Sequence, residues 1–338
     1  MERWLTELWY RESAGFSVLQ PLSYLYGLVM RLRRTAYARG WLKTQRAGKP
    51  VIVVGNLTVG GTGKTPLVAW LAEQLSLAGL VVGIVSRGYG RSKRAPEQVH
   101  SESAWRDVGD EPMLLQNLTG CDVVVAQDRF AGVQKLVALG VDVVIADDGL
   151  QHLRLARDCE IVVIDGARGF GNGRLLPAGP LREPASRVRH ADIVVTNGMP
   201  EHASLQAGEG KLEPASLQMS LFGEEAHRVD GLGAPELLER LRGQRVHAVA
   251  GIGNPQRFFR YLRARGIDVV EHPFPDHHPF TAADLTFGDT LPILMTHKDA
   301  VRCRELENAR LWYVPVVARF SESQGRELLD RVVRALAP

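Results

Sequence analysis

An α/β fold with a mostly parallel sheet is predicted by three observations. Short runs of β-branched residues alternate with helical patterns from Val51 onward. Most of these runs lack a strict apolar–polar alternation, which is typical of strands buried on both faces. A glycine-rich segment at 55–66 separates the first run from a helical pattern, which is the order of a phosphate-binding loop. We therefore expect a P-loop NTPase core and a second, smaller α/β lobe, with the active site in the cleft between them.

The first lobe is expected to hold most of the sheet. Its candidate strands are short runs rich in valine and isoleucine, at 51–54, 81–85, 122–126, 142–146, 160–164 and 193–196. Between them, apolar periodicity predicts helices at 67–77 and near 131–139, which end at Gly79 and Gly140. Glycine commonly follows a helix because it adopts the left-handed conformation there.

A second α/β unit is expected in the C-terminal part of the chain. Its candidate elements are strands at 246–250, 269–270, 293–296 and 312–317, a helix near 256–265 and a terminal amphipathic helix at 321–336. Residues 198–243 are less periodic and are interpreted as linker and peripheral structure. Three segments are therefore predicted: an N-terminal segment at 1–48 that belongs to the first lobe, a phosphate-loop core at 49–205, and a second lobe at 206–338 that includes the terminal helix.

The composition is that of an ordinary soluble protein with room for two cores. The chain has 338 residues, of which 45% are hydrophobic and 23% are charged. Its formal net charge of +3 gives no indication of a nucleic-acid partner. Three cysteines, Cys121, Cys159 and Cys303, lack the spacing of metal ligands, which predicts buried free thiols in a reducing compartment.

The N-terminal segment differs from the rest of the chain. Seven basic residues and no acidic residue lie between Arg31 and Lys49, after a largely apolar and aromatic stretch at 16–30. Three of the six tryptophans, Trp4, Trp9 and Trp41, fall in the same region. Interfacial aromatic residues, an apolar stretch and a polybasic flank predict peripheral or monotopic attachment to the cytoplasmic, anionic face of a membrane.

This segment has three other interpretations. A signal peptide is disfavoured because charged residues precede the apolar stretch and no small-residue cleavage site follows it. A membrane-spanning helix is disfavoured because the stretch is too short and Pro21 interrupts it. An amphipathic helix that packs on its own domain, with its basic residues solvated, remains an alternative.

The segment Gly-Asn-Leu-Thr-Val-Gly-Gly-Thr-Gly-Lys-Thr-Pro at 55–66 predicts a nucleoside triphosphate site. Its amides and the following helix N-terminus are expected to hold phosphates. The expected nucleotide contacts are consecutive residues of the loop: Thr58, Val59, Gly60, Gly61, Thr62, Gly63, Lys64 and Thr65. Lys64 is expected to reach the β- and γ-phosphates, and Thr65 to offer its hydroxyl to Mg²⁺. Thr58 departs from the strict pattern, which has glycine six residues before the lysine, and a glycine-rich turn without nucleotide is the alternative.

Two acidic segments are candidates for metal binding and catalysis. Asp147 and Asp148 close the apolar run at 143–146, where a carboxylate of a phosphate-loop protein holds Mg²⁺ directly or through water; a helix cap or a solvated bend is the alternative. Asp110 precedes Glu111 and Pro112, a pattern that by itself reads as a helix N-terminus. Phosphoryl transfer to an alcohol needs a carboxylate to accept the hydroxyl proton, but spacing alone does not select Asp110.

Further polar loops lie at or near predicted strand ends, where the sites of α/β proteins are built. They include 86–91, 127–129, 151–152 and 175–184, and their arginines suit phosphate recognition. In the second lobe, the turn Pro-Asp-His-His-Pro at 275–279 places two histidines side by side. Neighbouring residues point in different directions, so a shared metal is a weak interpretation. An imidazole that tunes a carboxylate across the cleft is favoured over a surface loop without a role.

The motifs together closely resemble the tetraacyldisaccharide 4′-kinase family, membrane-associated kinases of lipid A biosynthesis. They occur in family order over nearly the whole chain, at 55–66, 86–90, 109–112, 147–152, 175–183, 250–259, 274–278 and 296–299. In this family a small hydroxyl residue such as Thr58 is usual. Leu150, where an aromatic residue is common, is a mild variation.

The resemblance implies an ATP- and Mg²⁺-dependent kinase that transfers the γ-phosphate to the 4′-hydroxyl of tetraacyldisaccharide 1-phosphate. Its implied partners are this glycolipid and the inner-membrane surface, on the cytoplasmic side, without nucleic acid or an obligate protein partner. Lys64, Thr65, Asp147 and Asp148 are implied to serve ATP and Mg²⁺. Asp110 is implied to be the catalytic base, with His277 raising its reactivity. The residues implied to line the acceptor site are Tyr89, Arg129, Gln151, His152 and Arg182.

The strongest rival from another class is a membrane-surface ATPase switch without a lipid substrate. Such proteins carry a deviant loop whose first lysine reaches across a dimer, and Val59 occupies that position here. A soluble ligase or small-molecule kinase with the same loop does not account for the apolar, basic N-terminal segment.

Overall fold

A nine-stranded sheet forms the centre of the first lobe in the computed structural model, which describes residues 9–10, 18–88, 91, 95–206, 216–306 and 308–337. Its strands are β1 (Val51–Gly55), β2 (Val82–Ser86), β3 (Glu97–Val99), β4 (Asp122–Val125), β5 (Val143–Asp147), β6 (Cys159–Asp165), β7 (Ile193–Asn197), β8 (Leu217–Phe222) and β15 (Val317–Arg319). They are arranged in the order β15-β8-β7-β6-β1-β5-β2-β4-β3. Only the β3–β4 and β8–β15 pairs are antiparallel.

The predicted strands of this lobe are confirmed, with ends that differ by one residue at most. Their apolar runs are buried on both faces, as the lack of alternation indicated. Alternate residues of β1 enter two different cores: Ile52 and Val54 lie in one, and Val51 and Val53 in the other. Successive side chains of a strand point to opposite faces, so helices must cover both faces of the sheet.

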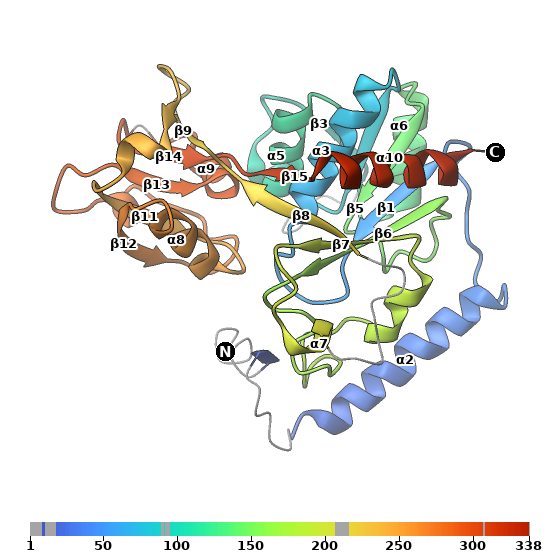
Figure 1. Ribbon diagram of the computed structural model, residues 1–338. Helices are drawn as coiled ribbons and strands as arrows, with labels where there is room; N and C mark the ends of the chain where they lie inside the picture. The colour runs from blue at the N-terminus through green and yellow to red at the C-terminus, as the bar shows by residue number, and fades with distance from the viewer. Residues whose placement is uncertain are drawn as a thin grey trace.

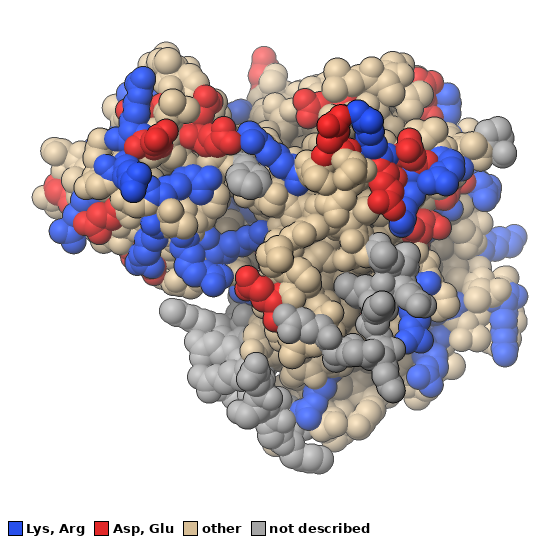
Figure 2. Space-filling view, viewed as in Figure 1, with Lys and Arg blue, Asp and Glu red and all other residues tan. Residues whose placement is uncertain are grey.

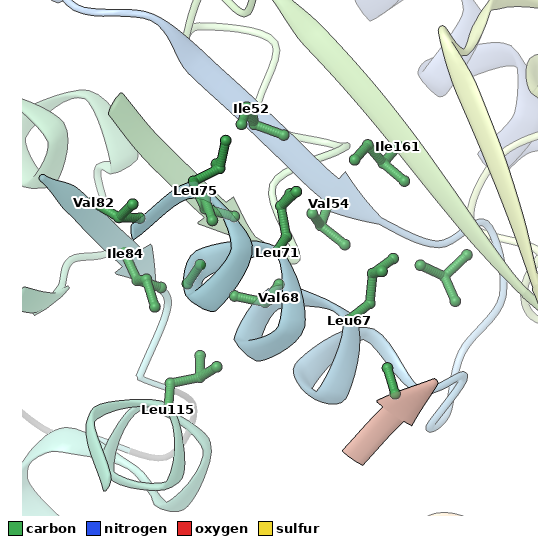
Figure 3. Packing of buried hydrophobic residues seen from close by; sticks show 14 of the residues in the cluster. Ile52, Val54, Leu67, Val68, Leu71, Leu75, Val82, Ile84, Leu115 and Ile161 are labelled. Carbon is green, nitrogen blue, oxygen red and sulfur yellow. The ribbon is translucent and has the colours of Figure 1, made fainter. Parts of the chain in front are cut away.

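The helix α3 (Lys64–Leu77) covers one face of the sheet (Figure 3). Leu67, Val68, Leu71 and Leu75 recur at helical spacing and are buried against the strands, including Ile52 of β1. Each such side chain contributes about 1.5–3 kcal/mol when it is removed from water. The packing therefore fixes the start of α3, and with it the preceding loop, at the carboxyl edge of the sheet.

Four further helices of the first lobe are α4 (Trp105–Val108), α5 (Asp110–Thr119), α6 (Arg129–Ala138) and α7 (Ala203–Gln206). A 3₁₀ helix, η1, spans Ala185–His190. The helix α6 matches the one expected near 131–139, and Gly140 follows it with a φ of 92°. Cys159 and Cys303 are buried, Cys121 is half-buried, and all three thiols are free, as expected.

The second lobe is a six-stranded sheet with the order β10-β9-β14-β13-β11-β12. Its strands are β9 (Glu225–Arg228), β10 (Glu236–Leu237), β11 (Arg245–Ala250), β12 (Asp268–Pro273), β13 (Ile293–Thr296) and β14 (Leu311–Val314). Its helical elements are α8 (Pro255–Arg263), α9 (His297–Cys303), η2 (Leu238–Leu241) and η3 (Ala283–Leu285). Two cores of its own lie on the faces of this sheet, and the lobe stands beside the first one in Figure 1.

The boundary of the second lobe differs from the expected range 206–338. The strand β8 pairs with β7, and β15 pairs with β8, so both belong to the nine-stranded sheet. The terminal helix α10 (Glu322–Leu336) also packs there, with Leu328 and Val332 in the same core as Leu71. The chain thus leaves the first lobe after β8 and returns to it at β15 (Figure 1). A return of this kind depends on pairing between distant segments, which has no local signature.

The interpretation of residues 198–243 as linker and peripheral structure is also wrong in part, because they contain β8, β9 and β10. The alternation of Leu217, Met219 and Leu221 with polar residues was a signal for β8. Its apolar residues pack into the first core, whereas Gln218 and Ser220 are only partly buried.

The N-terminal helix α2 (Gln20–Ala38) lies at the outer edge of the first lobe (Figure 1). One face is fixed to the lobe: Ser23 Oγ donates to Leu175 O at 2.6 Å, and Tyr26 Oη donates to Arg182 O at 2.9 Å. Large apolar side chains remain exposed on the same helix, at Leu22, Leu25, Leu28, Val29 and Leu32. In the described part of the chain, no helix combines the length and the apolar character that a membrane crossing requires.

Candidate active site

The glycine-rich loop joins β1 to α3 and requires glycine at two places. Gly60 and Gly63 have φ angles of 105° and 94°, in the left-handed region that other residues rarely adopt. A Cβ atom on Gly63 would lie 2.5 Å from Nδ2 of Asn197. That amide instead donates to Thr62 O at 2.9 Å, so Asn197 at the end of β7 holds the loop in place. The loop therefore requires glycine at Gly63 for both space and backbone conformation, and at Gly60 for backbone conformation.

Lys64 begins α3 and is held toward the carboxyl edge of the sheet. Its Nζ donates to Asn56 Oδ1 at 3.1 Å and lies 3.5 Å from Asp148 Oδ1. The α3 N-terminus has neither a side-chain cap nor an acidic residue in its first turn. Its amides and the Lys64 ammonium therefore form a positive site of the kind that binds phosphate.

Asp147 lies at the end of β5, next to the loop strand β1, and is 1% exposed. Its Oδ2 accepts a hydrogen bond from Ser86 Oγ at 3.3 Å, whereas its buried Oδ1 has no partner among the described residues. Burial, reinforced by the charge of Glu111, raises the pKa of Asp147 to about 7, although Lys64 opposes the shift. An unpaired carboxylate oxygen beside a phosphate site fits a hard divalent cation.

Asp148 follows with a φ of 50°, a left-handed conformation uncommon for a residue other than glycine. Its carboxylate accepts two hydrogen bonds from Arg182 Nη1, at 3.1 and 3.0 Å. Burial raises the pKa of Asp148, but the cations of Lys64 and Arg182 outweigh burial and hold this pKa below its usual range. Asp148 is therefore a permanent anion next to the loop.

Asp110 is brought to the same region at the start of α5 and is 4% exposed. The helix cap is Gly109, with a φ of 96°, so Asp110 itself does not cap the helix. Its Oδ2 lies 2.9 Å from Nδ1 of His277, which belongs to the second lobe. Burial raises the pKa of Asp110, but the hydrogen bond with His277 and the charges of Lys298 and Arg302 lower it to about 2.

The two adjacent histidines point apart, as the turn predicted. His277 has a φ of 59° and contacts Asp110, whereas His278 Nε2 lies 3.3 Å from Asp284 Oδ2. Burial lowers the pKa of His277, but the hydrogen bond with Asp110 raises it above its ordinary value overall. Among the described residues, no group of three or more histidine, cysteine, aspartate or glutamate side chains is arranged to hold a metal.

The residues expected at the acceptor site are placed differently from one another. Arg182 contacts the site by donating hydrogen bonds to Asp148. Gln151 Nε2 donates to Asn56 O at 3.3 Å and to Glu183 Oε1 at 3.0 Å. Burial and the charge of Arg129 lower the pKa of His152 to about 4, so this imidazole is neutral. Tyr89 lies outside the described residues.

Arg129 differs from its expected role as an acceptor contact. Its side chain is 1% exposed and donates to Ala126 O at 2.5 Å and to Asp147 O at 3.3 Å. Burial lowers its pKa to about 10, against the charges of Asp147 and Asp148. A buried guanidinium that binds the backbone of β5 positions Asp147 and offers no surface to a lipid. The sequence indicated an arginine at a strand end but not its depth.

Sequence reasoning missed residues that contact the Asp110–His277 pair or the loop. Lys298 Nζ lies 3.0 Å from Glu111 Oε1 and 3.3 Å from His277 Nε2. Arg302 Nε lies 3.5 Å from Asp110 Oδ2. Arg257 Nη2 donates to Asn197 Oδ1, the residue that supports the loop. The motif at 296–299 was a signal for Lys298, but nothing in its spacing indicated which carboxylate it meets.

These features define the class: a phosphate-loop phosphotransferase in which a carboxylate of the core and an imidazole of a second lobe face each other beside the loop. A sequence model of the family "Tetraacyldisaccharide-1-P 4'-kinase" matches residues 16–334. The chain belongs to this family.

Individual relatives agree with the family match. The tetraacyldisaccharide 4′-kinase of Alkalilimnicola ehrlichii is 51% identical over 321 residues, which cover 92% of this chain and 91% of the relative. That of Nitrosococcus oceani is 46% identical over 329 residues, covering 97% and 94%. A crystal structure of LpxK from Aquifex aeolicus in complex with ATP has a TM-score of 0.76 at 32% identity, covering 94% of this chain and 98% of that chain. The predicted α/β fold, enzyme class and kinase function in lipid A biosynthesis are confirmed.

Proposed function

We propose that Asp110 accepts the proton of the 4′-hydroxyl of tetraacyldisaccharide 1-phosphate while the loop at 58–65 holds the ATP whose γ-phosphate is transferred. The observation that carries this assignment is the Asp110–His277 contact between the two lobes, 2.9 Å from Oδ2 to Nδ1. A carboxylate with a pKa of about 2 is ionised at every physiological pH. It can therefore accept a hydrogen bond from an alcohol and take its proton as the phosphoryl group arrives.

ATP is assigned to the loop because its phosphates match the donors found there. The two left-handed glycines, Gly60 and Gly63, open the backbone toward the edge of the sheet. Lys64 lies beside Asn56 and Asp148 and can exchange these contacts for the β- and γ-phosphates. In-line phosphoryl transfer depends chiefly on positioning and charge stabilisation, which this arrangement supplies.

Mg²⁺ is assigned to Thr65, Asp147 and Asp148. The unpaired Oδ1 of Asp147 and the ionised carboxylate of Asp148 lie beside the loop. Mg²⁺ usually takes one or two carboxylates together with substrate phosphates, so the lack of a larger carboxylate cluster among the described residues fits this ion. When bound, the ion neutralises charge on the phosphate oxygens. Arg129 then acts through Asp147, whose backbone it holds.

The acceptor is expected near Arg182, Gln151 and His152. Arg182 is only partly buried and is the cation closest to Asp148 among the contacts described above. A guanidinium in this position suits an anionic sugar phosphate. Tyr89 remains assigned to the acceptor by the motif at 86–90 alone.

The membrane is assigned to the exposed face of α2. Leu22, Leu25, Val29 and Leu32 are spaced by three or four residues and therefore lie along one stripe. The adjacent face carries Ser23 and Tyr26, which fix the helix to the lobe. A lipid acceptor must be reached at a surface, and arginines next to an apolar stripe favour the anionic cytoplasmic face of the inner membrane.

The test combines purified full-length protein, ATP labelled on its γ-phosphate, Mg²⁺ and detergent-dispersed tetraacyldisaccharide 1-phosphate. Label should move into the lipid fraction, and the product should carry it on the 4′-oxygen. Omission of Mg²⁺ should abolish the transfer. Label recovered only as free phosphate would contradict the assignment and favour an ATPase switch.

A further inference from the structure

We propose that Lys298 is a positioning residue whose ammonium opposes protonation of His277 Nε2 and keeps the single proton of the neutral ring on Nδ1. The proposal rests on the function proposed above for Asp110, whose partner His277 is. Its consequence is that a larger fraction of His277 is neutral near pH 7 than the flanking carboxylates alone would allow, although the pKa of His277 stays above its ordinary value. Lys298 lies in the first turn of α9, directly after β13, and reaches the pair from the side opposite to Asp110.

The ammonium of Lys298 lies among three groups. Its Nζ is 3.0 Å from Glu111 Oε1, 3.3 Å from Asp276 Oδ1 and 3.3 Å from His277 Nε2. Burial lowers the pKa of Lys298, but the neighbouring carboxylates of Glu111, Asp110 and Asp276 outweigh burial and raise this pKa above its ordinary value. Lys298 is therefore charged throughout the pH range in which the enzyme works.

The tautomer of His277 follows from the chemistry of its neighbours. An ammonium has three donors and no acceptor, so the Nε2 atom that faces it must carry the lone pair. The ring proton is then on Nδ1, where it donates to Asp110 Oδ2 at 2.9 Å. A second proton on Nε2 would point at the ammonium, and two like charges would meet at 3.3 Å.

The remaining charges around the ring do not remove this effect. Asp276 Oδ1 lies 3.8 Å from Nε2 and favours the imidazolium, as does Asp110 on the other side. Arg302 faces Asp110 at 3.5 Å and is itself paired with Asp299. Lys298 therefore opposes a protonation that both carboxylates promote.

The charge of His277 matters for the proposed role of Asp110. A neutral imidazole orients Asp110 by one hydrogen bond and leaves its negative charge available to the substrate hydroxyl. An imidazolium would add a full positive charge beside the carboxylate and lower its basicity. The proton on Nδ1 stays there in either case, so Lys298 sets the charge of the pair and not its geometry.

Lys298 also joins the two lobes through Glu111, so its loss needs a control that separates charge from bracing. Arg106 and Glu305 form another ion pair between the lobes, at 3.5 Å, and this pair is exposed. Arg106→Met removes a cross-lobe ion pair without touching His277. It therefore controls for the loss of an ion pair between the lobes, although Arg106 is more exposed than Lys298.

The direct test is histidine side-chain NMR on the full-length protein labelled with ¹⁵N, with His277→Asn used to assign the signal. In the unmodified protein, His277 should show a protonated Nδ1 and an unprotonated Nε2 at pH 8. In Lys298→Met, the pKa of His277 should rise by about one unit or more, and Lys298→Arg should restore it. If Lys298→Met is too unstable, Lys298→Gln serves, because its uncharged amide should also let the pKa rise. A proton on Nε2 in the unmodified protein, or an unchanged titration in the variants, would overturn the proposal.

The kinetic test uses the pH profile of kcat. Lys298→Met should lose about tenfold in kcat near pH 7 and recover much of it near pH 9, as one unit of pKa corresponds to a tenfold change in population. Arg106→Met should have the profile of the unmodified enzyme. A loss in Lys298→Met that is equal at every pH would show a structural brace and overturn the proposal. If Asp110→Ala keeps its turnover, the role of Asp110 fails, whereas the NMR result on His277 is decided independently.

Discussion

Arg257 of the second lobe donates a hydrogen bond from Nη2 to Oδ1 of Asn197 in the first lobe, at 2.6 Å. The Asn197 amide in turn donates to Thr62 O, within the phosphate loop, at 2.9 Å. Arg257 Nη1 also lies 3.5 Å from Asp165 Oδ2 at the end of β6. Two hydrogen bonds thus connect the position of α8 to the conformation of the loop. In the proposed mechanism the second lobe supplies His277, and through Arg257 it also contacts the loop assigned to ATP.

Arg257→Ala should weaken ATP binding. A hydrogen bond that involves a charged group contributes about 1.5–3 kcal/mol, so we expect the KM for ATP to rise at least tenfold, with a smaller change in the KM for the lipid. Arg260→Ala, an exposed arginine on the same helix, is the matched control. Equal nucleotide affinity in Arg257→Ala and the unmodified protein, measured by calorimetry, would contradict the connection.

Asp110→Ala should lower kcat by about 10²–10⁴, the usual contribution of a positioned general base. ATP affinity should change little because Asp110 contacts His277, Arg302 and its own helix, and not the loop. The measurement is label transfer to lipid together with equilibrium binding of ATP. Asp107→Ala, an exposed residue of α4, controls for the loss of a nearby charge. Normal turnover in Asp110→Ala would remove this residue from the mechanism.

Asp147→Asn should stabilise the metal-free protein at pH 8 while it abolishes Mg²⁺-dependent transfer. Burial holds the pKa of Asp147 at about 7 in the folded state, above roughly 3.9 in an unfolded chain. The folded state therefore keeps a proton that the unfolded chain releases. The contribution of Asp147 to stability is fully present below about pH 4, falls as the pH rises to about 7 and is constant above it.

The gain in Asp147→Asn should follow the same range of pH. It should be on the order of a few kcal/mol in the free energy of unfolding above pH 7 and should vanish near pH 4. Chemical unfolding at several pH values in the presence of a chelator measures it. Asp268→Asn, in an exposed ion pair with Arg245, should show no such dependence. A gain that is independent of pH would mean that ionisation of Asp147 does not destabilise the folded state.

Leu25→Glu combined with Leu32→Glu should reduce recovery with anionic vesicles by more than tenfold, because each leucine buried in a membrane contributes about 1.5–3 kcal/mol. Leu77→Glu is the matched control, as Leu77 is 76% exposed at the end of α3. Raising the salt concentration should weaken the binding of the unmodified protein further, by screening its arginines (Arg31, Arg33 and Arg34). Unchanged sedimentation of the double variant would remove α2 from membrane attachment.

The surface charge of the second lobe is a separate matter from α2. Lysine and arginine side chains gather over part of this lobe in Figure 2. Among the arginines of this lobe, Arg263 is paired with Glu271 and Arg245 with Asp268. They are consistent with a solvated face, and the interpretation of the vesicle experiment on α2 does not depend on them.

Local sequence patterns were sufficient to predict the strands of the first lobe and the site residues that directly follow them. Valine and isoleucine runs predicted strands to within one residue, because strands buried on both faces must be apolar throughout. The order of strand, glycine loop and helix predicted Lys64, and an acidic pair after an apolar run predicted Asp147 and Asp148. Each of these signals lies within about a dozen residues of chain.

Pairings between distant segments were decided by the tertiary structure alone. Asp110 and His277 are 167 residues apart, and the sequence could connect them only through the family they resemble. The contact of Lys298 with His277, the depth of Arg129 and the return of β15 and α10 to the first sheet had no local signature. The reason is physical: a periodic pattern reports the face on which a residue lies, whereas charge, protonation and burial at this site depend on which two faces meet.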